Sequence, residues 1–580
     1  MASPASSAKS DEKTALQTAL TRARGGFGIA MALSFLVNLL MLVSPLYMLQ
    51  AYDRVLTSGS TSTLLYLTII AAVALLVLGV FEALRTAILT RTAAWSAEAA
   101  RDSVLSSTFQ AKFLHPDSSS QPVRDLKQVQ NFLSGQGVTP ILDAPWAPGF
   151  IVIIWIMHPS LGVLAIISAI ILAAIGISNE LFTRAAMRDA NQRSVASMEA
   201  LDSALQNAEV IEAMGMRGAA IARWKALDTE ASASGELAAE RSGFFTGASK
   251  FVRLSSQMAV LGLGALLVLQ GELTAGGMVA ASILLGRALA PLEQLIGAWK
   301  SLIATLASYG RVQTLLRTAP ETEKPFDLPE PKANISVRSL YYKPAPDAPP
   351  ILSNVSFDVK EGECLGVIGA SAAGKTTLCR LLTGVYMPTA GEVRLDNAEL
   401  SFWDRAALGR HMGYLPQSVD LFIANIAVNI SRLGNPDPEA VVAAAQLAGV
   451  HEMILHLTDG YDTRYVQGGR VISAGQRQRI GLARAVYGTP KLIVLDEPNS
   501  NLDAAGEAAL HKAVVALKKA GRAIVIVAHR RDALANADKL VVLRGGQIAA
   551  YGPAADVFRQ LDEEVAARRG NPRLVSGGKP

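Results

Sequence analysis

Cysteine and charged residues are both scarce in this chain of 580 residues. Only two cysteines are present, Cys364 and Cys379, and charged residues make up 18% of the sequence. We interpret both cysteines as small buried apolar residues in a reducing compartment, rather than as a disulfide or metal ligands. Charged residues usually make up about 25% of a soluble chain. The deficit therefore indicates that part of the chain is unusually apolar.

Two signals for partners or targeting are also missing. No basic run with interleaved aromatic residues occurs, and a net charge of +5 is small for this length. We therefore predict no nucleic-acid partner. Residues 1–24 are polar, and the apolar segment after them is long and lacks an evident cleavage site, so no cleavable secretory signal is indicated. The length itself predicts two or more domains.

Six apolar segments in the first half account for the low charge. Each is long enough for a helix that crosses the hydrocarbon core of a bilayer. The expected spans are 26–47, 63–81, 141–157, 161–177, 254–269 and 278–292. The alternative is that they are buried helices of a large soluble core. We favour spans, because hydropathy identifies membrane helices well.

The segments between the expected spans alternate between short and long. The two long ones, after spans two and four, are helical in pattern and rich in arginine and lysine, whereas the short ones contain only Arg54. By the positive-inside bias, the long segments and both termini are cytosolic. Residues 207–216 predict a short helix ending at Gly215, which could rest on another domain or be an ordinary loop helix.

A few polar and aromatic residues lie in or near the spans. Asp143 could face a translocation path, or begin a helix ahead of Pro145. For Arg287 we expect snorkelling or pairing within the bundle, with a pore-lining role as the alternative. Trp146 and Trp155 are interpreted as interfacial anchors rather than as substrate contacts.

A phosphate-binding pattern organises the second half. Residues 369–377 follow a short apolar run and precede a helical pattern, the context in which G-x-x-x-x-G-K-[ST] binds phosphate. Small residues let the loop curl so that backbone N–H groups point at phosphate oxygens. Lys375 would supply charge for the β- and γ-phosphates, and the Thr376 hydroxyl would ligate Mg²⁺. The predicted nucleotide contacts are Gly369, Ala370, Ser371, Ala372, Ala373, Gly374, Lys375, Thr376 and Thr377.

A second carboxylate motif lies downstream in the same half. The apolar run 491–495 predicts a buried strand that ends in Asp496 and Glu497. Asp496 is expected to hold Mg²⁺, and Glu497 to polarise an attacking water. From residue 334 onward, strand and helix patterns alternate, which predicts an α/β domain with a largely parallel sheet. The proline-rich stretch 318–331 reads as the linker before it.

Residues 472–476, Ile-Ser-Ala-Gly-Gln, resemble the signature motif of ATP-binding cassette proteins. The resemblance implies a head-to-tail homodimer, in which this motif faces the ATP held by the other subunit. It also implies a role for each matching residue. Ser473, Gly475 and Gln476 would contact the γ-phosphate, Tyr342 would stack on adenine, Gln417 would couple Mg²⁺ to the membrane loops, Asp503 would act across the dimer, and His529 would contact the γ-phosphate.

Two alanines depart from the family pattern. Ala372 and Ala474 stand where the family usually has glycine. If either position needs left-handed backbone geometry, its Cβ costs about 1 kcal/mol. Since every charged group of the motifs is present, we predict an active but slow ATPase.

A narrower resemblance gives a substrate class. Residues 44–54, 143–148, 207–212 and 496–503 are similar to the type I secretion exporters of the PrtD kind. This implies export of unfolded proteases, lipases or S-layer proteins with C-terminal signals across the inner membrane. It also implies a periplasmic adaptor and an outer-membrane channel as partners, and the short N-terminal tail argues against a leader-cleaving exporter. The alternatives are an exporter of lipid or small molecules, and a regulatory ATPase that does not transport.

The predicted fold is therefore an all-α membrane domain of six helices followed by an α/β P-loop ATPase domain. We expect a cytosolic tail at 1–24, the membrane domain at 25–316, a linker at 317–333, the nucleotide-binding domain at 334–560 and a C-terminal tail at 561–580.

Overall fold

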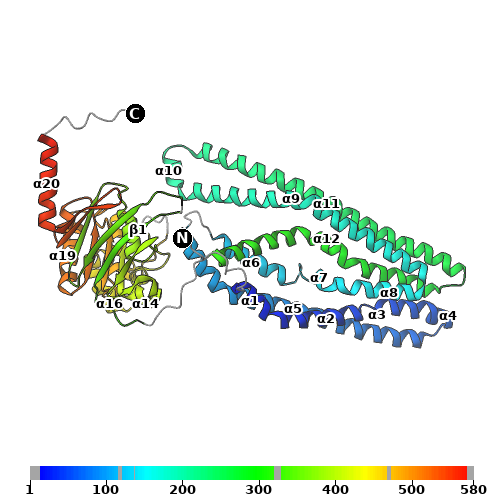
Figure 1. Cartoon of the computed structure of the whole chain (residues 1–580). Helices are drawn as coiled ribbons and strands as arrows, with labels where there is room; N and C mark the ends of the chain where they lie inside the picture. Colours follow the sequence, from blue (N-terminus) through cyan, green and yellow to red (C-terminus); the bar gives the residue numbers. More distant parts are fainter. Residues whose placement is uncertain are drawn as a thin grey trace, which may run out of the picture. The chain divides into compact units, whose positions relative to one another are not determined.

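The computed structural model describes residues 14–114, 120–135, 137–318, 328–345, 347–466 and 472–570 (Figure 1). The chain divides into two compact units, Met1–Pro320 and Glu321–Pro580. Most of the linker predicted at 318–331 falls outside the described residues.

The described part of the first unit is helical. Its helices are α1 (Ala15–Arg22), α2 (Arg24–Leu40), α3 (Val43–Gln50), the π-helical turn η1 (Ala51–Val55), α4 (Leu56–Ser58), α5 (Thr61–Leu114), α6 (Gln121–Leu133), α7 (Thr139–Asp143), the 3-10 turn η2 (Ala144–Trp146), α8 (Ala147–Met157), α9 (Pro159–Gln206), α10 (Ala208–Ala213), α11 (Arg217–Leu269) and α12 (Ala275–Thr318). Among the described residues, six helical stretches are long and apolar enough to cross a membrane, as predicted.

Four of these helices are far longer than a bilayer requires. Helices α5, α9, α11 and α12 run for 54, 48, 53 and 44 residues. At about 1.5 Å per residue each exceeds ~65 Å, about twice the thickness of the hydrocarbon core. The basic segments that sequence patterns separate from the spans are therefore largely continuations of the same helices. In Figure 1, α9 and α11 lie side by side as a long hairpin, with α10 at its tip.

Helix α12 is the most enclosed of the six, with half of its most apolar stretch buried. Small residues such as Gly276, Gly277 and Ala281 face its neighbours, and small residues let membrane helices approach closely. A Cβ on Gly276 would come within 2.6 Å of the Leu49 carbonyl oxygen. The Asp53 carboxylate caps the start of α12 by accepting from the Gly276 amide at 2.8 Å. The connection between spans one and two thus holds the last span in place.

A buried polar cluster around Asp143 joins the first three spans. The Asp143 carboxylate accepts hydrogen bonds through one oxygen from Ser34 (2.7 Å), Asn38 (3.0 Å) and Arg85 (2.8 Å). Asp143 is the N-cap residue of η2, ahead of Pro145, but its side chain makes no helix-capping hydrogen bond there. Arg85 lies in the basic segment that follows the second predicted span and that we expect to be cytosolic, yet it is only 2% exposed and also pairs with Glu82. The two ion-pair partners are 58 residues apart, which no local pattern reveals.

The other residues singled out near the spans have simpler surroundings. Arg287 is exposed, and it has no ion pair within the described part of the chain. Trp155 is 44% exposed on the outside of α8. Trp146 packs against Phe35, with ring centroids 4.9 Å apart. Snorkelling or lining a path stays open for Arg287, whereas pairing within the described bundle is not observed.

The second unit is built on two sheets. A largely parallel sheet has the order β10-β9-β3-β8-β7-β6 with β10 antiparallel at its edge, and an antiparallel sheet has the order β2-β1-β4-β5. The parallel sheet was predicted; the antiparallel one was not. The strands are β1 (Ile335–Tyr342), β2 (Leu352–Val359), β3 (Cys364–Gly369), β4 (Ala390–Leu395), β5 (Ala398–Glu399), β6 (Met412–Leu415), β7 (Leu492–Asp496), β8 (Ala523–Val527), β9 (Lys539–Arg544) and β10 (Gln547–Pro553).

Helices pack around the sheets of this unit and bury two hydrophobic clusters. Strands β7 and β8 are buried at every position, as expected of central parallel strands. The helices are α13 (Lys375–Leu382), α14 (Arg405–His411), α15 (Ile426–Ile430), α16 (Pro438–Leu447), α17 (His451–Leu455), α18 (Ala474–Val486), α19 (Ala504–Lys519) and α20 (Ala554–Gly570). The 3-10 turns are η3 (Leu400–Phe402), η4 (Gly460–Asp462) and η5 (Asp532–Leu534).

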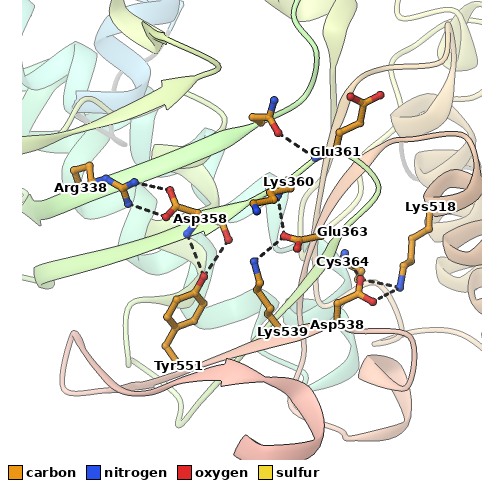
Figure 2. Close-up of polar contacts among 11 residues, drawn as sticks. Arg338, Asp358, Lys360, Glu361, Glu363, Cys364, Lys518, Asp538, Lys539 and Tyr551 are labelled. Atoms are coloured by element: carbon orange, nitrogen blue, oxygen red, sulfur yellow. Dashed lines mark hydrogen bonds and ion pairs between the residues drawn. The ribbon is translucent and has the colours of Figure 1, made fainter.

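A polar network holds the start of β3 against its neighbours (Figure 2). The Asp538 carboxylate accepts from the Cys364 amide at 2.8 Å and pairs with Lys518 at 2.8 Å. Glu363 pairs with Lys539 at 2.9 Å. These contacts lie at the amino end of β3, so they fix the strand whose other end carries the phosphate-binding pattern.

Candidate active site

The predicted phosphate loop joins β3 to α13. Gly374, the N-cap residue of α13, has φ +94°, and a Cβ there would come within 2.7 Å of a Leu352 methyl group. Glycine is therefore required at this position. The Lys375 ammonium donates to the carbonyl oxygens of Gly369 and Ala370, both at 2.9 Å. Burial lowers the pKa of Lys375, while the carboxylates of Glu497 and Asp496 act in the opposite direction.

The two departures from the family pattern differ in the structure. Ala372 has φ +63°, so its Cβ carries the left-handed penalty of about 1 kcal/mol. Ala474 is the first residue of α18 and has no positive φ, so its Cβ is not strained. The left-handed backbone strain that the sequence left open for both alanines is therefore present only at Ala372.

Asp496 ends β7 next to the phosphate loop, and it is 1% exposed. Both of its carboxylate oxygens are buried without a hydrogen-bond partner among the described residues. Burial raises the pKa of Asp496, and the nearby Thr376 hydroxyl opposes this shift. A buried carboxylate with free lone pairs, close to a hydroxyl, fits a hard cation that takes oxygen ligands.

No cluster of three or more acidic, histidine or cysteine ligands exists within the described ranges. Of the predicted metal ligands, Thr376 and Asp496 lie together, and Gln417 reaches the same region through Glu497. Protein ligands of this number suit Mg²⁺, which keeps waters and binds phosphate oxygens for the rest of its coordination shell. The residues therefore fit the cation.

Glu497, Gln417 and His529 meet in one cluster. The Glu497 carboxylate accepts from the Gln417 amide at 3.0 Å, and its other oxygen lies 2.8 Å from Nε2 of His529. Glu497 has φ +50°, a conformation that costs a non-glycine residue roughly 1–3 kcal/mol and is found most often at functional sites. Its side chain is 17% exposed, so water has access to it.

The signature-like motif begins α18. The Ser473 hydroxyl accepts a hydrogen bond from the backbone N–H of Gln476 at 3.3 Å. In return, the side-chain oxygen of Gln476 accepts one from the backbone N–H of Ser473 at 2.8 Å. Ser473 is exposed, so its hydroxyl and the start of the helix can meet another molecule. Within the described part of the unit, no hydrogen bond or ion pair links this motif to the phosphate loop.

The motif contacts the loop that contains Asp503 instead. Asp503 begins α19 by accepting from the Gly506 amide at 2.8 Å, and it pairs with Arg479 of α18. A Cβ on Gly475 would lie 2.7 Å from the Asn501 carbonyl oxygen. The hydrogen bonds that Asp503 accepts lower its pKa, and the one from the backbone N–H of Gly506 is the largest cause, followed by the one from Arg479.

Tyr342 lies at the end of β1 and stacks on Tyr386, with ring centroids 5.3 Å apart and an angle of 4° between the ring planes. Tyr386 is held by Arg380, whose guanidinium donates to its hydroxyl at 2.8 Å. Sequence reasoning missed Tyr386, because no motif contains it. The one indication of its location is that it follows α13 by a few residues.

Comparison with known proteins now identifies the family. Residues 352–500 match the family described as ABC transporter, and residues 27–289 match the ABC transporter transmembrane region. The chain is 40% identical, over 558 residues, to the Type I secretion system ATP-binding protein PrsD of Rhizobium meliloti, which covers 96% of this chain and 95% of that protein. This chain is an ABC transporter of the type I secretion family.

Other relatives agree with this placement. The transporter is 30% identical over 554 residues to the alpha-hemolysin translocation ATP-binding protein HlyB of Escherichia coli, covering 93% of this chain and 78% of that one. It is 31% identical over 532 residues to the leukotoxin translocation ATP-binding protein LktB of Mannheimia haemolytica, covering 90% and 74%. A solved bacterial Atm1-family ABC exporter with ATP bound matches the fold, with a TM-score of 0.79 at 21% identity over 96% of this chain and 99% of that one.

The comparisons confirm the predicted family and fold class. The chain is a membrane-embedded ABC exporter whose ATPase domain binds and hydrolyses ATP in step with transport.

Proposed function

We propose that this ABC transporter exports unfolded polypeptides that carry C-terminal signals, as the energised component of a type I secretion system. The observation that carries the proposal is the 40% identity to a type I secretion ATP-binding protein along nearly the whole chain. As a member of a type I secretion system, the transporter would work with a periplasmic adaptor and an outer-membrane channel. The transporter lies in the inner membrane, with both termini and the ATPase unit in the cytoplasm, in agreement with its basic helix extensions.

The phosphate loop and Asp496 hold the substrate ATP. Lys375 leaves the loop carbonyls for the β- and γ-phosphates, since ionic partners are stronger than neutral ones. Tyr342 offers the ring face turned away from Tyr386 to adenine. Mg²⁺ held by Thr376, Asp496 and Gln417 would neutralise charge on the transferred phosphate. The two orphaned oxygens of Asp496 support this assignment.

Glu497 is the general base for the attacking water. Its contacts with Gln417 and His529 hold the carboxylate in one orientation, and the backbone strain at Glu497 supports a functional role. With ATP bound, His529 would contact the γ-phosphate, and Gln417 is one of the residues that would hold Mg²⁺.

The active unit is a homodimer with head-to-tail ATPase units. Ser473 is exposed at a helix start whose amide groups suit phosphate, and nothing described in its own unit presents phosphate to it. A second copy would supply that phosphate. Asp503, also exposed, would lie in the same interface and report nucleotide across the dimer.

The test is transport by the purified full-length protein in lipid vesicles. We expect ATP hydrolysis to be stimulated by a peptide from the C-terminal end of a secreted protein and not by added lipid. A Glu497→Gln variant should bind ATP, form a stable dimer and lose at least about 100-fold in turnover, the usual scale for removing a general base. Stimulation by lipid alone would contradict polypeptide export, and normal turnover of the variant would remove Glu497 from its role.

A further inference from the structure

Gln478 is a buried side chain of α18, just over one turn into the helix. The residue is 1% exposed. Its side-chain nitrogen, Nε2, donates a hydrogen bond to the carbonyl oxygen of Pro498 at 3.3 Å. Pro498 directly follows Glu497, the proposed general base. The side chain of Gln478 therefore reaches the main chain next to the catalytic carboxylate.

The main chain that Gln478 contacts is strained. Glu497 has φ +50°, and a conformation of this kind persists only where the surrounding structure holds it. On the amino side, the Glu497 amide donates to the Val527 carbonyl oxygen at 2.9 Å. The peptide bond to Pro498 has no N–H, so hydrogen bonds can hold it only through its carbonyl oxygen, which accepts from the Ser500 amide at 3.2 Å. The side of Glu497 that leads to Pro498 therefore has the weaker restraint.

The hydrogen bond from Gln478 restrains this weaker side. The proline ring fixes φ of Pro498 at about −65°, so ψ is the remaining freedom of that residue, and ψ sets the direction of its carbonyl oxygen. A donor that fixes this oxygen therefore fixes the main chain that leaves Glu497. The carboxylate depends on that main chain, because a displacement of about 1 Å in an active site can slow a reaction by about 100-fold.

Two more contacts join α18 to the same segment, but they lie farther from the base. A Cβ on Gly475 would lie 2.7 Å from the Asn501 carbonyl oxygen. Arg479 forms an ion pair with Asp503. These partners lie four and six residues after the base, whereas the acceptor of the Gln478 amide is the residue next to it. The segment after the base thus lies along α18, and Gln478 holds the end that carries the carboxylate.

The side-chain amide of Gln478 has only one of its two polar atoms satisfied. The other atom, Oε1, is buried and has no hydrogen-bond partner among the described residues. A buried acceptor without a donor costs free energy. For packing alone, a methionine of nearly the same shape would serve as well or better. The contribution of Gln478 therefore comes through its nitrogen.

We infer that Gln478 is a positioning residue for ATP hydrolysis, which keeps the Glu497 carboxylate in place by holding the Pro498 carbonyl oxygen. The inference rests on the proposed function, because Glu497 is the proposed general base. The groups proposed to hold ATP, the phosphate loop and Tyr342, belong to β3, α13 and β1. Loss of this hydrogen bond should therefore slow turnover and leave ATP affinity nearly unchanged.

The experiment compares Gln478→Met with the native full-length protein in lipid nanodiscs. Methionine keeps the length and packing of glutamine and removes the donor. We expect kcat for ATP hydrolysis to fall about tenfold and KM for ATP to change by less than about twofold. The temperature of unfolding should stay the same or rise, since an unpaired buried acceptor is removed as well. A residue with a purely structural role would lose stability together with turnover.

A double-mutant comparison tests whether the effect passes through Glu497. In the Glu497→Gln background, single-turnover hydrolysis of radiolabelled ATP measures the residual rate. Gln478→Met should change that rate by less than about twofold, because a residue that acts only by placing the carboxylate has no effect once the carboxylate is gone. An effect that is independent of Glu497 would appear in full in both backgrounds.

Lys518→Met is the matched control. The Lys518 ammonium group also donates to a backbone carbonyl oxygen of the ATPase unit, that of Asn536 at 2.9 Å, and it pairs with Asp538. We expect this variant to unfold at a lower temperature and to keep kcat within about twofold of the native value, because these contacts lie away from the base. The two methionine variants thus separate loss of stability from loss of turnover.

Three results would overturn the inference. They are a kcat of Gln478→Met within about threefold of the native value, an equal loss in the Glu497→Gln background, and a fall in unfolding temperature that accompanies the loss of turnover. If Glu497→Gln itself keeps normal turnover, the proposed base is wrong and the inference fails with it. If Glu497→Gln is slowed as expected and Gln478→Met is not, only the inference fails.

Discussion

Two buried carboxylates, one in each unit, have opposite surroundings. Asp143 in the membrane unit accepts three hydrogen bonds, one of them from the buried Arg85. Asp496 in the ATPase unit accepts none among the described residues, although it is more deeply buried. Breaking the contacts of a satisfied buried acid destabilises a fold, whereas an unsatisfied one costs free energy until a ligand arrives. The first therefore belongs to structure and the second to function.

The largest expected effect on stability comes from removing the charge of Asp143. Asp143→Asn removes one of the two carboxylates that pair with the buried Arg85 and leaves only the half-exposed Glu82, which should destabilise the full-length protein by about 3 kcal/mol. Thermal unfolding of the detergent-purified protein measures this. Ser34→Ala, which removes one neutral donor, is the control and should cost only about 1 kcal/mol. Equal stability of Asp143→Asn and the native protein would contradict a structural role.

The matching change in the other unit should have the opposite outcome. Asp496→Asn removes an unpaired buried charge, so it should leave stability without nucleotide unchanged or higher. Turnover of ATP should fall by at least about 100-fold, because a cation ligand stabilises transition-state charge by several kcal/mol. Turnover and thermal unfolding of the same preparation test both statements. An Asp496→Asn protein that is less stable than the native protein and still hydrolyses ATP normally would contradict both statements.

The dependence of stability on pH gives a further test of the unpaired Asp496. Burial raises the pKa of Asp496, so the folded protein binds its proton more tightly than the unfolded chain does. In the absence of Mg²⁺, stability should therefore fall as pH rises from the ordinary value of about 3.9 through the raised pKa. Asp496→Asn should lack this contribution. Thermal unfolding of both proteins between about pH 4 and 7 gives the difference, and added Mg²⁺ with ATP should restore native stability at the upper end.

The smallest expected effect concerns the two alanines. Ala372→Gly removes a Cβ at φ +63° and should stabilise the phosphate loop by about 1 kcal/mol. Ala474→Gly lies in the first turn of α18 and should instead destabilise by roughly 0.5–1 kcal/mol. Thermal unfolding with and without ATP compares them directly. Changes of the same sign would mean that backbone geometry does not distinguish the two positions.

Much of the ATPase unit could be predicted from sequence, because its chemistry lies in contiguous motifs. The loop at 369–377, the strand ending in Asp496 and the start of α18 were found from local patterns, and the structure has them on the predicted elements. The six spans were found for the same reason, since hydropathy is also local.

The rest depends on contacts between distant segments. Gln417 and Glu497 are 80 residues apart, and Arg85 and Asp143 are 58 apart. Only the packed fold decides which partner each side chain meets. The strain at Ala372 was raised as a question and needed the backbone for its answer.

The uninterrupted length of α9 has a mechanical consequence. Among its 48 residues there is no break, and 29 of them, residues 178–206, extend beyond its predicted span. Because α9 is continuous, a tilt imposed at one end of the helix also moves its other end. A rotation of about 10° about the membrane surface would sweep a point ~30 Å along the rod through about 5 Å, roughly one helical turn. Modest displacement at the tip of the hairpin is thereby enough to reshape the far end inside the bilayer.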